Sequence, residues 1–170
     1  MRTIPLAVTA LASALLLTAC NGSGGGSSDS KNSSACSFDG VAVQVGPAST
    51  APAAGDSGEV PVSLTNQSKP CTLDGFPTVA VKKGDGGEVS VPTLKGAKAQ
   101  KLKLAKGDAA AFTIAYVRGK EGGDQSFAAT TVVVTLPGNK ESKSYKWSYG
   151  PIQGKSDVDA SVSAFTQSGD

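Results

Sequence analysis

The fold is organised around residues Glu59–Pro77, which read EVPVSLTNQSKPCTLDGFP. Val60, Val62 and Leu64 alternate with proline, serine and threonine, and this period of two is typical of a strand with one buried face. A polar turn follows the strand, and Cys71 stands directly after a proline. Glycine and proline then break the chain again before the next apolar run. The stretch therefore predicts a buried strand that leads into a corner at Cys71.

Short apolar runs separated by turn residues recur along the rest of the chain, which contains 21 Gly and 9 Pro. The runs alternate or are β-branched, and no long stretch shows the 3.6-residue period of a helix. The predicted strands are 41–45, 59–66, 78–82, 88–91, 99–104, 110–117, 130–136, 144–149 and 158–165. This pattern predicts an all-β domain over residues 36–170, folded as an antiparallel β-sandwich of about seven to nine strands.

Residues 1–19 have the features of a signal peptide. The apolar part, residues 4–17, is too short to span about 30 Å of hydrocarbon as a permanent helix. Residues 17–20 read LTAC and resemble the lipobox of bacterial lipoproteins, in which a peptidase cuts before the cysteine and the thiol is acylated. We therefore expect cleavage between Ala19 and Cys20, with lipid such as palmitate carried by the mature N-terminus.

Lipidation of Cys20 predicts a protein held on the extracytoplasmic face of the cell membrane. The alternative is an ordinary signal peptide in which this cysteine has no role. Residues 20–35 are dominated by Gly, Ser and Asn and predict a flexible tether, with a root-mean-square reach of roughly 20 Å. The serines of this tether are candidate acceptors of O-linked sugar, and the alternative is a plain solvated linker.

The charge of the chain argues against nucleic acid as a partner. It has 16 Lys and Arg against 14 Asp and Glu, a net charge of +2. Removal of the signal peptide takes away one arginine and no acid, so the mature chain is closer still to neutral. Nucleic-acid binding depends on a strong positive excess, which this composition lacks.

Two cysteines remain once Cys20 carries lipid. Cys36 and Cys71 are most simply paired in a disulfide, because exported domains fold in oxidising surroundings. The alternative is a thiolate metal site, but zinc needs two further ligands, and the chain offers neither histidine nor another cysteine. We expect no metal and no cofactor.

Catalysis finds little support in the sequence. Residues 55–58 read GDSG, like the nucleophile motif of trypsin-like proteases, but that chemistry needs a general base, and the chain has no histidine. We therefore expect a protein that is not an enzyme.

Two features are candidates for a binding surface. Lys101 and Lys103 share one face of a predicted strand, within an acid-free stretch that runs from Lys95 to Lys106. They form either a solvated strand face or a contact for an anionic envelope polymer or partner protein. Trp147 shares a face with two tyrosines and belongs either to the core or to an exposed platform that stacks on a sugar or partner.

The sequence also resembles the actinobacterial domain of unknown function 4232 family. In that family a strand led by glycine ends in Thr-Asn and precedes Cys-Thr-Leu-x-Gly-aromatic-Pro, which residues 58–66 and 71–77 match. The opening cysteine matches Cys36, and a later Leu-x-x-Gly-x-x-Ala-x-Phe pattern matches residues 104–112. The resemblance implies an Ig-like fold and an exported lipoprotein, and it implies no activity. Some relatives carry a second cysteine pair that this chain lacks.

These observations predict a membrane-anchored lipoprotein whose sandwich is a non-catalytic interaction module of the cell envelope. The first alternative is a binding protein for a small ligand or a cell-wall polymer, which an exposed Trp147 would favour. The second alternative is an enzyme, whose active site the sequence does not supply.

Overall fold

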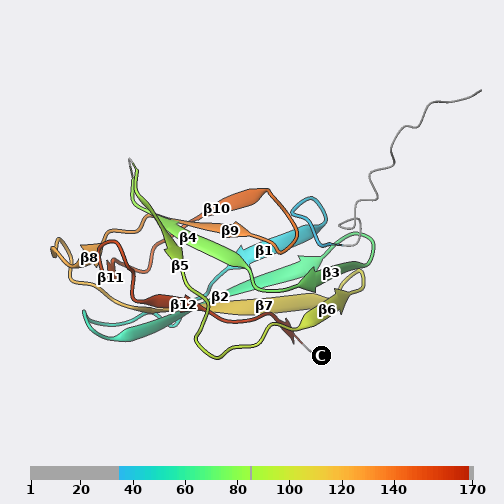
Figure 1. Ribbon diagram of the computed structural model, residues 1–170, viewed down its shortest axis with the longest axis horizontal. Coiled ribbons are helices and arrows are strands. Elements are labelled where there is room, and N and C mark those ends of the chain that lie inside the picture. The colour runs from blue at the N-terminus through green and yellow to red at the C-terminus, as the bar shows by residue number, and fades with distance from the viewer. Residues whose placement is uncertain (1–34, 85, 169–170) are drawn as a thin grey trace, which may run out of the picture. The chain divides into compact units, whose positions relative to one another are not determined.

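The computed structural model describes residues 35–84 and 86–168 (Figure 1). Within these ranges the chain forms 13 strands joined by turns and loops. No helix that is long and apolar enough to cross a membrane is found in the same ranges. The predicted signal peptide, the cleavage site, the lipidated Cys20 and nearly all of the tether lie outside the described residues.

Two antiparallel sheets form most of the domain. The first sheet consists, in spatial order, of β1 (Val41–Val45), β2 (Ser57–Asn66), β7 (Ala109–Val117) and β12 (Ala160–Val162), and β13 (Thr166–Ser168) also pairs with β7. The second sheet consists of β10 (Ser142–Lys146), β9 (Thr131–Thr135), β4 (Thr78–Lys82) and β5 (Glu88–Val91). Two short pairs are β3 (Cys71–Asp74) with β6 (Lys101–Leu104), and β8 (Ser126–Phe127) with β11 (Ile152–Gln153).

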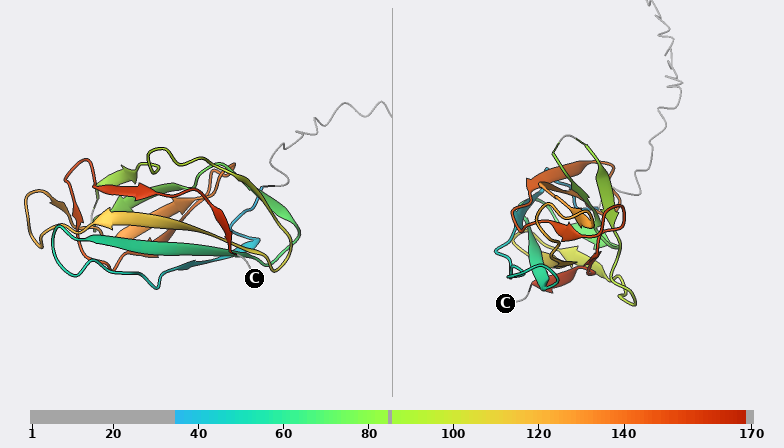
Figure 2. Two further views of the ribbon diagram at one scale, coloured as in Figure 1. Left: turned by 90° about the horizontal axis from the view of Figure 1, so that it is seen from below. Right: turned by 90° about the vertical axis from the view of Figure 1, so that its left-hand side faces the viewer.

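The core lies between the two sheets and confirms the predicted sandwich. β2 and β7 run side by side (Figure 2), with Val60 opposite Ile114 and Val62 opposite Phe112. These four side chains are buried because alternate residues of each strand point to the same side. The second sheet adds the buried residues Val79, Val81, Val132 and Val134 to the same cluster. Each such side chain contributes roughly 1.5–3 kcal/mol by leaving water.

A buried amide joins the strands at one end of the sandwich. Asn66, the last residue of β2, is fully buried, and its Nδ2 donates to the carbonyl oxygens of Lys69, Leu104 and Ala105 at 3.0–3.1 Å. Its Oδ1 accepts a hydrogen bond from the backbone N–H of Ser68 at 3.0 Å. One side chain thereby ties the end of β2 to the following turn and to β6.

The disulfide predicted from the sequence is present at the same end. Cys36 and Cys71 are bonded, with their Cα atoms 4.8 Å apart. The predicted corner is also found, but it continues directly into β3, a strand that was not predicted. Prolines and polar residues surround the four residues of β3, so their pairing with β6 is not visible as a local pattern.

The other end of the sandwich requires a glycine. Gly58 lies opposite Tyr116, and a Cβ built on Gly58 would lie 2.5 Å from the Tyr116 ring. The ring covers this glycine, and the Tyr116 hydroxyl donates to the backbone carbonyl of Tyr149 at 3.0 Å. The glycine that begins the strand motif is therefore explained by the close approach of an aromatic side chain.

Several predicted strand ends are wrong. Of the predicted strand 158–165, only β12 is formed, and β13, which was not predicted, follows it and pairs with a different part of β7. Between them, the backbone N–H of Thr113 donates to the hydroxyl of Ser163 at 2.9 Å, so a side chain replaces the usual backbone acceptor. The predicted strand 144–149 begins at Ser142 and ends at Lys146. The strand total exceeds the prediction because pairs such as β8 with β11 are only two residues long.

Candidate functional site

Lys101 and Lys103 project from the outer side of β6, as the sequence predicts. On the inner side, Leu102 and Leu104 are buried against the core. Because side chains alternate across a strand, the two lysines face solvent, and both are exposed. In this strand the lysines therefore place their charges in solvent, and the leucines fill the core.

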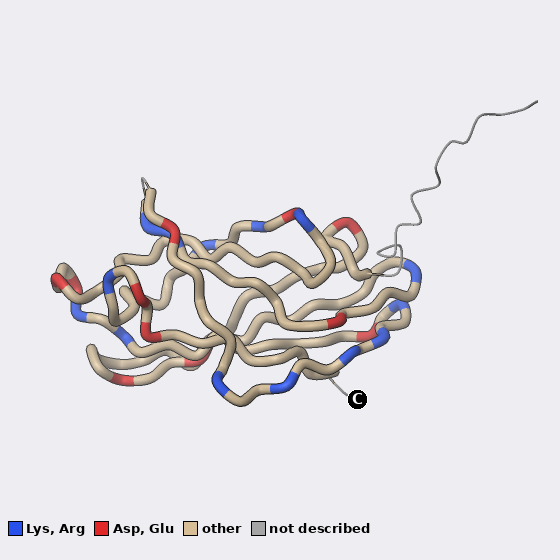
Figure 3. Tube along the Cα trace, viewed as in Figure 1, with Lys and Arg blue, Asp and Glu red and all other residues tan. Residues whose placement is uncertain are grey.

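Neighbouring segments extend this positive surface. Lys95 and Lys98 are exposed in the loop between β5 and β6, and Lys106 is exposed in the turn that follows β6. We call these three residues, with Lys101 and Lys103, the lysine face. Figure 3 shows its blue positions following one another along the lower edge of the domain.

Two carboxylates lie close in sequence or space to these five lysines. Asp74 of β3 accepts from Lys101, with Nζ and Oδ2 3.0 Å apart, and both side chains are more than half exposed. An ion pair so open to water contributes roughly 0–1 kcal/mol. Asp108 accepts a hydrogen bond from the backbone N–H of Ala105 at 2.8 Å and thereby holds the turn after β6. Lys103 lies opposite the uncharged Thr72, so the lysine face keeps an excess of positive charge.

An exposed leucine adjoins the lysine face. Among the described residues, Leu94 is the large hydrophobic side chain that remains exposed, at 47%. Its backbone is fixed, since its N–H donates to the Val162 carbonyl at 2.8 Å and its own carbonyl accepts from Ala97 at 3.0 Å. Gly96 has a φ of 81° and permits this tight turn. Leu94 is thus held at the surface beside Lys95.

Trp147 does not belong to this surface: of the two alternatives that the sequence left open, the structure shows the core and not the exposed platform. Its side chain is only 3% exposed and packs edge-to-face against Tyr116 and Tyr149, with ring centroids 5.2 and 5.0 Å apart. The indole Nε1 donates to the Gly150 carbonyl at 2.8 Å, so its polar atom is satisfied inside the protein. Burial also raises the pKa of the half-buried Tyr145 phenol. These aromatic residues close the core.

The described chain begins next to the lysine face. Ala35 pairs with Thr72 of β3, and the backbone N–H of Cys36 donates to the Thr72 carbonyl at 3.0 Å. Thr72 in turn lies opposite Lys103 in the pairing of β3 with β6. Neighbouring strands are about 4.8 Å apart, so the Cα atoms of Ala35 and Lys103 are separated by roughly 10 Å.

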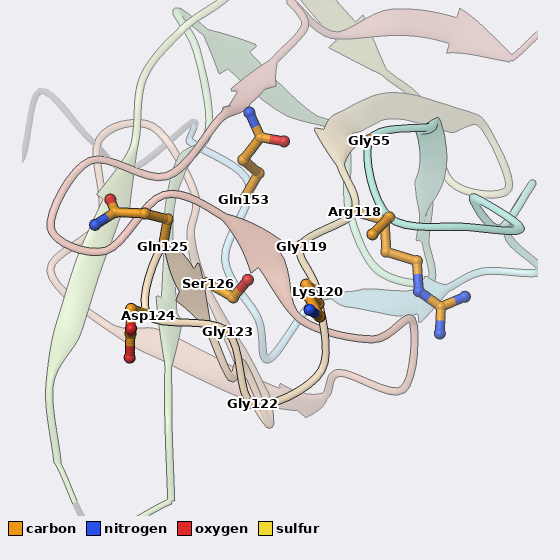
Figure 4. A pocket seen from close by; sticks show the side chains of 11 residues that line it. Gly55, Arg118, Gly119, Lys120, Gly122, Gly123, Asp124, Gln125, Ser126 and Gln153 are labelled. Atoms are coloured by element: carbon orange, nitrogen blue, oxygen red, sulfur yellow. The ribbon is translucent and has the colours of Figure 1, made fainter.

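An open pocket of about 690 Å³ lies at the other end of the sandwich (Figure 4). The side chains of Arg118, Asp124 and Gln125 line it, but they point away from one another. Arg118 Nη1 donates to the carbonyl oxygens of Ala51 and Pro52, at 2.9 and 3.3 Å. The guanidinium therefore holds a neighbouring loop, and no group of side chains converges on a ligand position.

A family model described as a domain of unknown function, DUF4232, matches residues 36–166. The chain belongs to the DUF4232 family. The match begins at the first cysteine of the disulfide and ends at the first residue of β13, so the DUF4232 domain is the sandwich described above. No curated protein matches the sequence.

The motif residues quoted for the family resemblance occupy structural positions in the fold. Gly58 receives the Tyr116 ring, Asn66 joins three segments, and Cys71 forms the disulfide. Gly75, at a φ of 119°, turns the chain after β3. Lys101 and Lys103 lie outside these motifs, so the lysine face is a property of this chain that the family signature does not specify. The alternation of Lys with Leu is the signal that identified it.

Proposed function

We propose that this chain is an exported lipoprotein, anchored in the cell membrane through Cys20, and that its DUF4232 domain is a non-catalytic binding module on the extracytoplasmic face. The signal peptide and the lipobox at residues 17–20 support export and anchoring. The disulfide between Cys36 and Cys71 supports the same location, because structural disulfides persist in oxidising compartments.

The lysine face is the observation that carries the binding role. Lys101 and Lys103 are exposed, whereas the leucines between and after them fill the core. The backbone that carries these charges is already ordered in a strand, so contact with a partner restricts only the lysine side chains, and their excess of positive charge favours an anionic partner. The partner expected on this surface is an anionic component of the envelope.

Binding without turnover agrees with the residue types available. The chain has no histidine, and Cys36 and Cys71 are joined, so the two side chains that most often shuttle protons or attack substrates near neutral pH are missing or blocked. A stacking site for sugar has no support at Trp147, whose ring is buried. We therefore assign binding to the lysine face.

The anchor is tested by metabolic labelling with an alkyne fatty acid. We expect label on the protein in cells, and we expect the Cys20→Ala variant to lose the label and to be left uncut or shed. A variant in which Ser23 is replaced by alanine is the matched control, because it alters the tether and leaves the lipobox intact. Label that persists after Cys20→Ala would refute lipidation at this residue.

The binding role is tested by crosslinking in intact cells. The protein is compared with a Lys101→Glu/Lys103→Glu variant and with a Lys120→Glu/Lys155→Glu control, which makes the same change in charge elsewhere. We expect the first pair to reduce capture of anionic envelope components and the second pair to leave it unchanged. Equal capture by all three proteins would contradict the proposal.

A further inference from the structure

We infer that the lysine face is a docking surface for the anionic phospholipid bilayer in which the protein is anchored, and that this contact fixes the orientation of the domain. The inference rests on the proposed lipidation of Cys20. It identifies the partner of the lysine face as the anionic bilayer, and it predicts which end of the sandwich faces that bilayer.

The point at which the tether joins the domain lies close to the lysine face, so the anchor would hold this face near the bilayer. Ala35 pairs with Thr72, and Thr72 pairs with Lys103, which places the start of the described domain roughly 10 Å from the lysine face. Residues 21–34 separate Ala35 from Cys20, and their composition predicts a tether with a reach of roughly 20 Å. The tether thus keeps the lysine face at a high effective concentration near the membrane surface.

The charge of the face matches anionic lipid. Five lysines face two carboxylates, so about three positive charges are available to headgroups. Each lysine near an anionic surface strengthens binding by roughly fivefold, so three charges predict a preference of roughly a hundredfold for anionic over zwitterionic lipid. The chain as a whole is nearly neutral, so this preference depends on where the charges lie, and it selects one orientation.

The exposed Leu94 side chain favours a bilayer over a soluble polyanion as the partner of this surface. Its exposed side chain adjoins Lys95, and the hydrogen bonds of its backbone to Val162 and Ala97 hold it outward. Peripheral membrane contacts combine apolar side chains that enter the headgroup region with cations that bind the headgroups. A soluble polymer would use the lysines and would leave the leucine in water.

The opposite end of the sandwich would then face away from the membrane. The open pocket beside Arg118 lies at that end and is lined in part by Lys120 (Figure 4), and Lys155 follows two residues after the end of β11. Lys120 and Lys155 are also exposed, so they serve as internal controls for any effect of lipid on the reactivity of lysine side chains.

Lysine footprinting on vesicles tests the inference. The mature chain starting at Cys20 is coupled through that thiol to a maleimide lipid, since the other two cysteines are joined in the disulfide. It is then bound to vesicles of phosphatidylcholine, alone or mixed with phosphatidylglycerol, and acetylated with an activated ester. We expect anionic lipid to slow acetylation of the lysine face by roughly fivefold or more, and to leave Lys120 and Lys155 unchanged.

Two variants separate the charged contribution from the apolar one. With Lys101→Gln/Lys103→Gln, the protection of Lys95 and Lys98 should fall and should depend less on salt concentration, because fewer charges are screened. The Leu94→Ser variant should also bind more weakly, but its salt dependence should match that of the unchanged protein. The Lys120→Gln/Lys155→Gln control should behave like the unchanged protein.

The outcomes distinguish failure of this inference from failure of the anchor. Equal acetylation of the lysine face on both kinds of vesicle would overturn the inference, whatever the cell does to Cys20. Protection by soluble poly(glycerol phosphate) on phosphatidylcholine vesicles that exceeds protection by phosphatidylglycerol would also overturn it, in favour of a polymer contact. Absence of fatty-acid label from the unchanged protein in cells would refute the anchor, on which the membrane orientation depends.

Discussion

The two ends of this sandwich are closed by different chemistry. At the disulfide end, Cys36 is bonded to Cys71, and the buried Asn66 amide joins the segments around β6. At the aromatic end, Tyr116 packs against Trp147, and the Arg118 guanidinium donates to backbone carbonyls. Both ends are held by internal contacts, but the outward charges of the lysine face lie at and beside the disulfide end.

This difference shows which charged residues are available to a partner. Arg118 is only partly exposed, and its hydrogen bonds hold the loop at Ala51 and Pro52. Lys103 lies on a strand whose inward neighbours already bury their side chains, so its charge is not required to hold that strand. A covalent crosslink and a buried amide can therefore stabilise one end of the domain while its surface lysines serve another purpose.

The largest effect should come from the aromatic end. Trp147→Ala should lower the free energy of unfolding by about 3–5 kcal/mol, because the indole fills the space between Tyr116 and Tyr149. Urea unfolding measures this loss, and Trp147→Phe should lose less because a ring remains. A Trp147→Ala domain with unchanged stability and weaker capture of envelope components would return this residue to the binding surface.

Removal of the disulfide should have the next largest effect. Cys36→Ser/Cys71→Ser should cost roughly 2–5 kcal/mol, and the chain-entropy estimate for a 35-residue separation is about 4 kcal/mol. The measurement is urea unfolding with and without reductant. Reductant should destabilise the original protein and leave the double variant unchanged. If reductant lowers the stability of both proteins equally, the crosslink is not the cause.

The fold could be predicted from sequence where patterns are local. The alternation in β2 and β7 gave their faces correctly, and the bounds of β4 and β5 match the predicted ones. The failures depend on distant partners. β3 is short and is recognised only by its pairing with β6, and β12 ends before Ser163, whose hydroxyl accepts a hydrogen bond from the backbone N–H of Thr113. Sequence windows do not contain such contacts.

A smaller effect is expected from the buried amide. Asn66→Ala should lower the free energy of unfolding by about 1–3 kcal/mol, because the Leu104 carbonyl oxygen loses a buried donor and the Ala105 carbonyl oxygen a partly buried one. Gln67→Ala, at the exposed neighbouring position, is the control and should change stability by less than about 0.5 kcal/mol. Equal losses in the two variants would show that the Asn66 network contributes nothing particular.

The candidate surface could be predicted only in part. The lysines of β6 were found because their alternation with leucine reports orientation directly. For Trp147 the same argument left two alternatives open, since alternation predicts that residues share a face and does not say which face is inward. Leu94 was missed because an isolated leucine in a loop gives no local sign that it is exposed. The proximity of Ala35 to Lys103 required the pairing of both with Thr72.

The smallest effect on stability should come from the lysine face, and this prediction most sharply separates it from the rest of the disulfide end. Lys101→Gln/Lys103→Gln removes one exposed ion pair, with Asp74, and otherwise changes only solvated side chains. Such a pair contributes about 0–1 kcal/mol, and relief of repulsion among the remaining lysines offsets part of that loss. The free energy of unfolding measured in urea should therefore match that of the Lys120→Gln/Lys155→Gln control to within about 0.5 kcal/mol.

The affinity of the Lys101→Gln/Lys103→Gln variant for anionic vesicles should nevertheless fall by roughly 25-fold, at about fivefold for each charge removed. A fall in stability as large as that of Asn66→Ala would show that these lysines help to hold the sandwich together, and their outward charge would then need no partner to explain it.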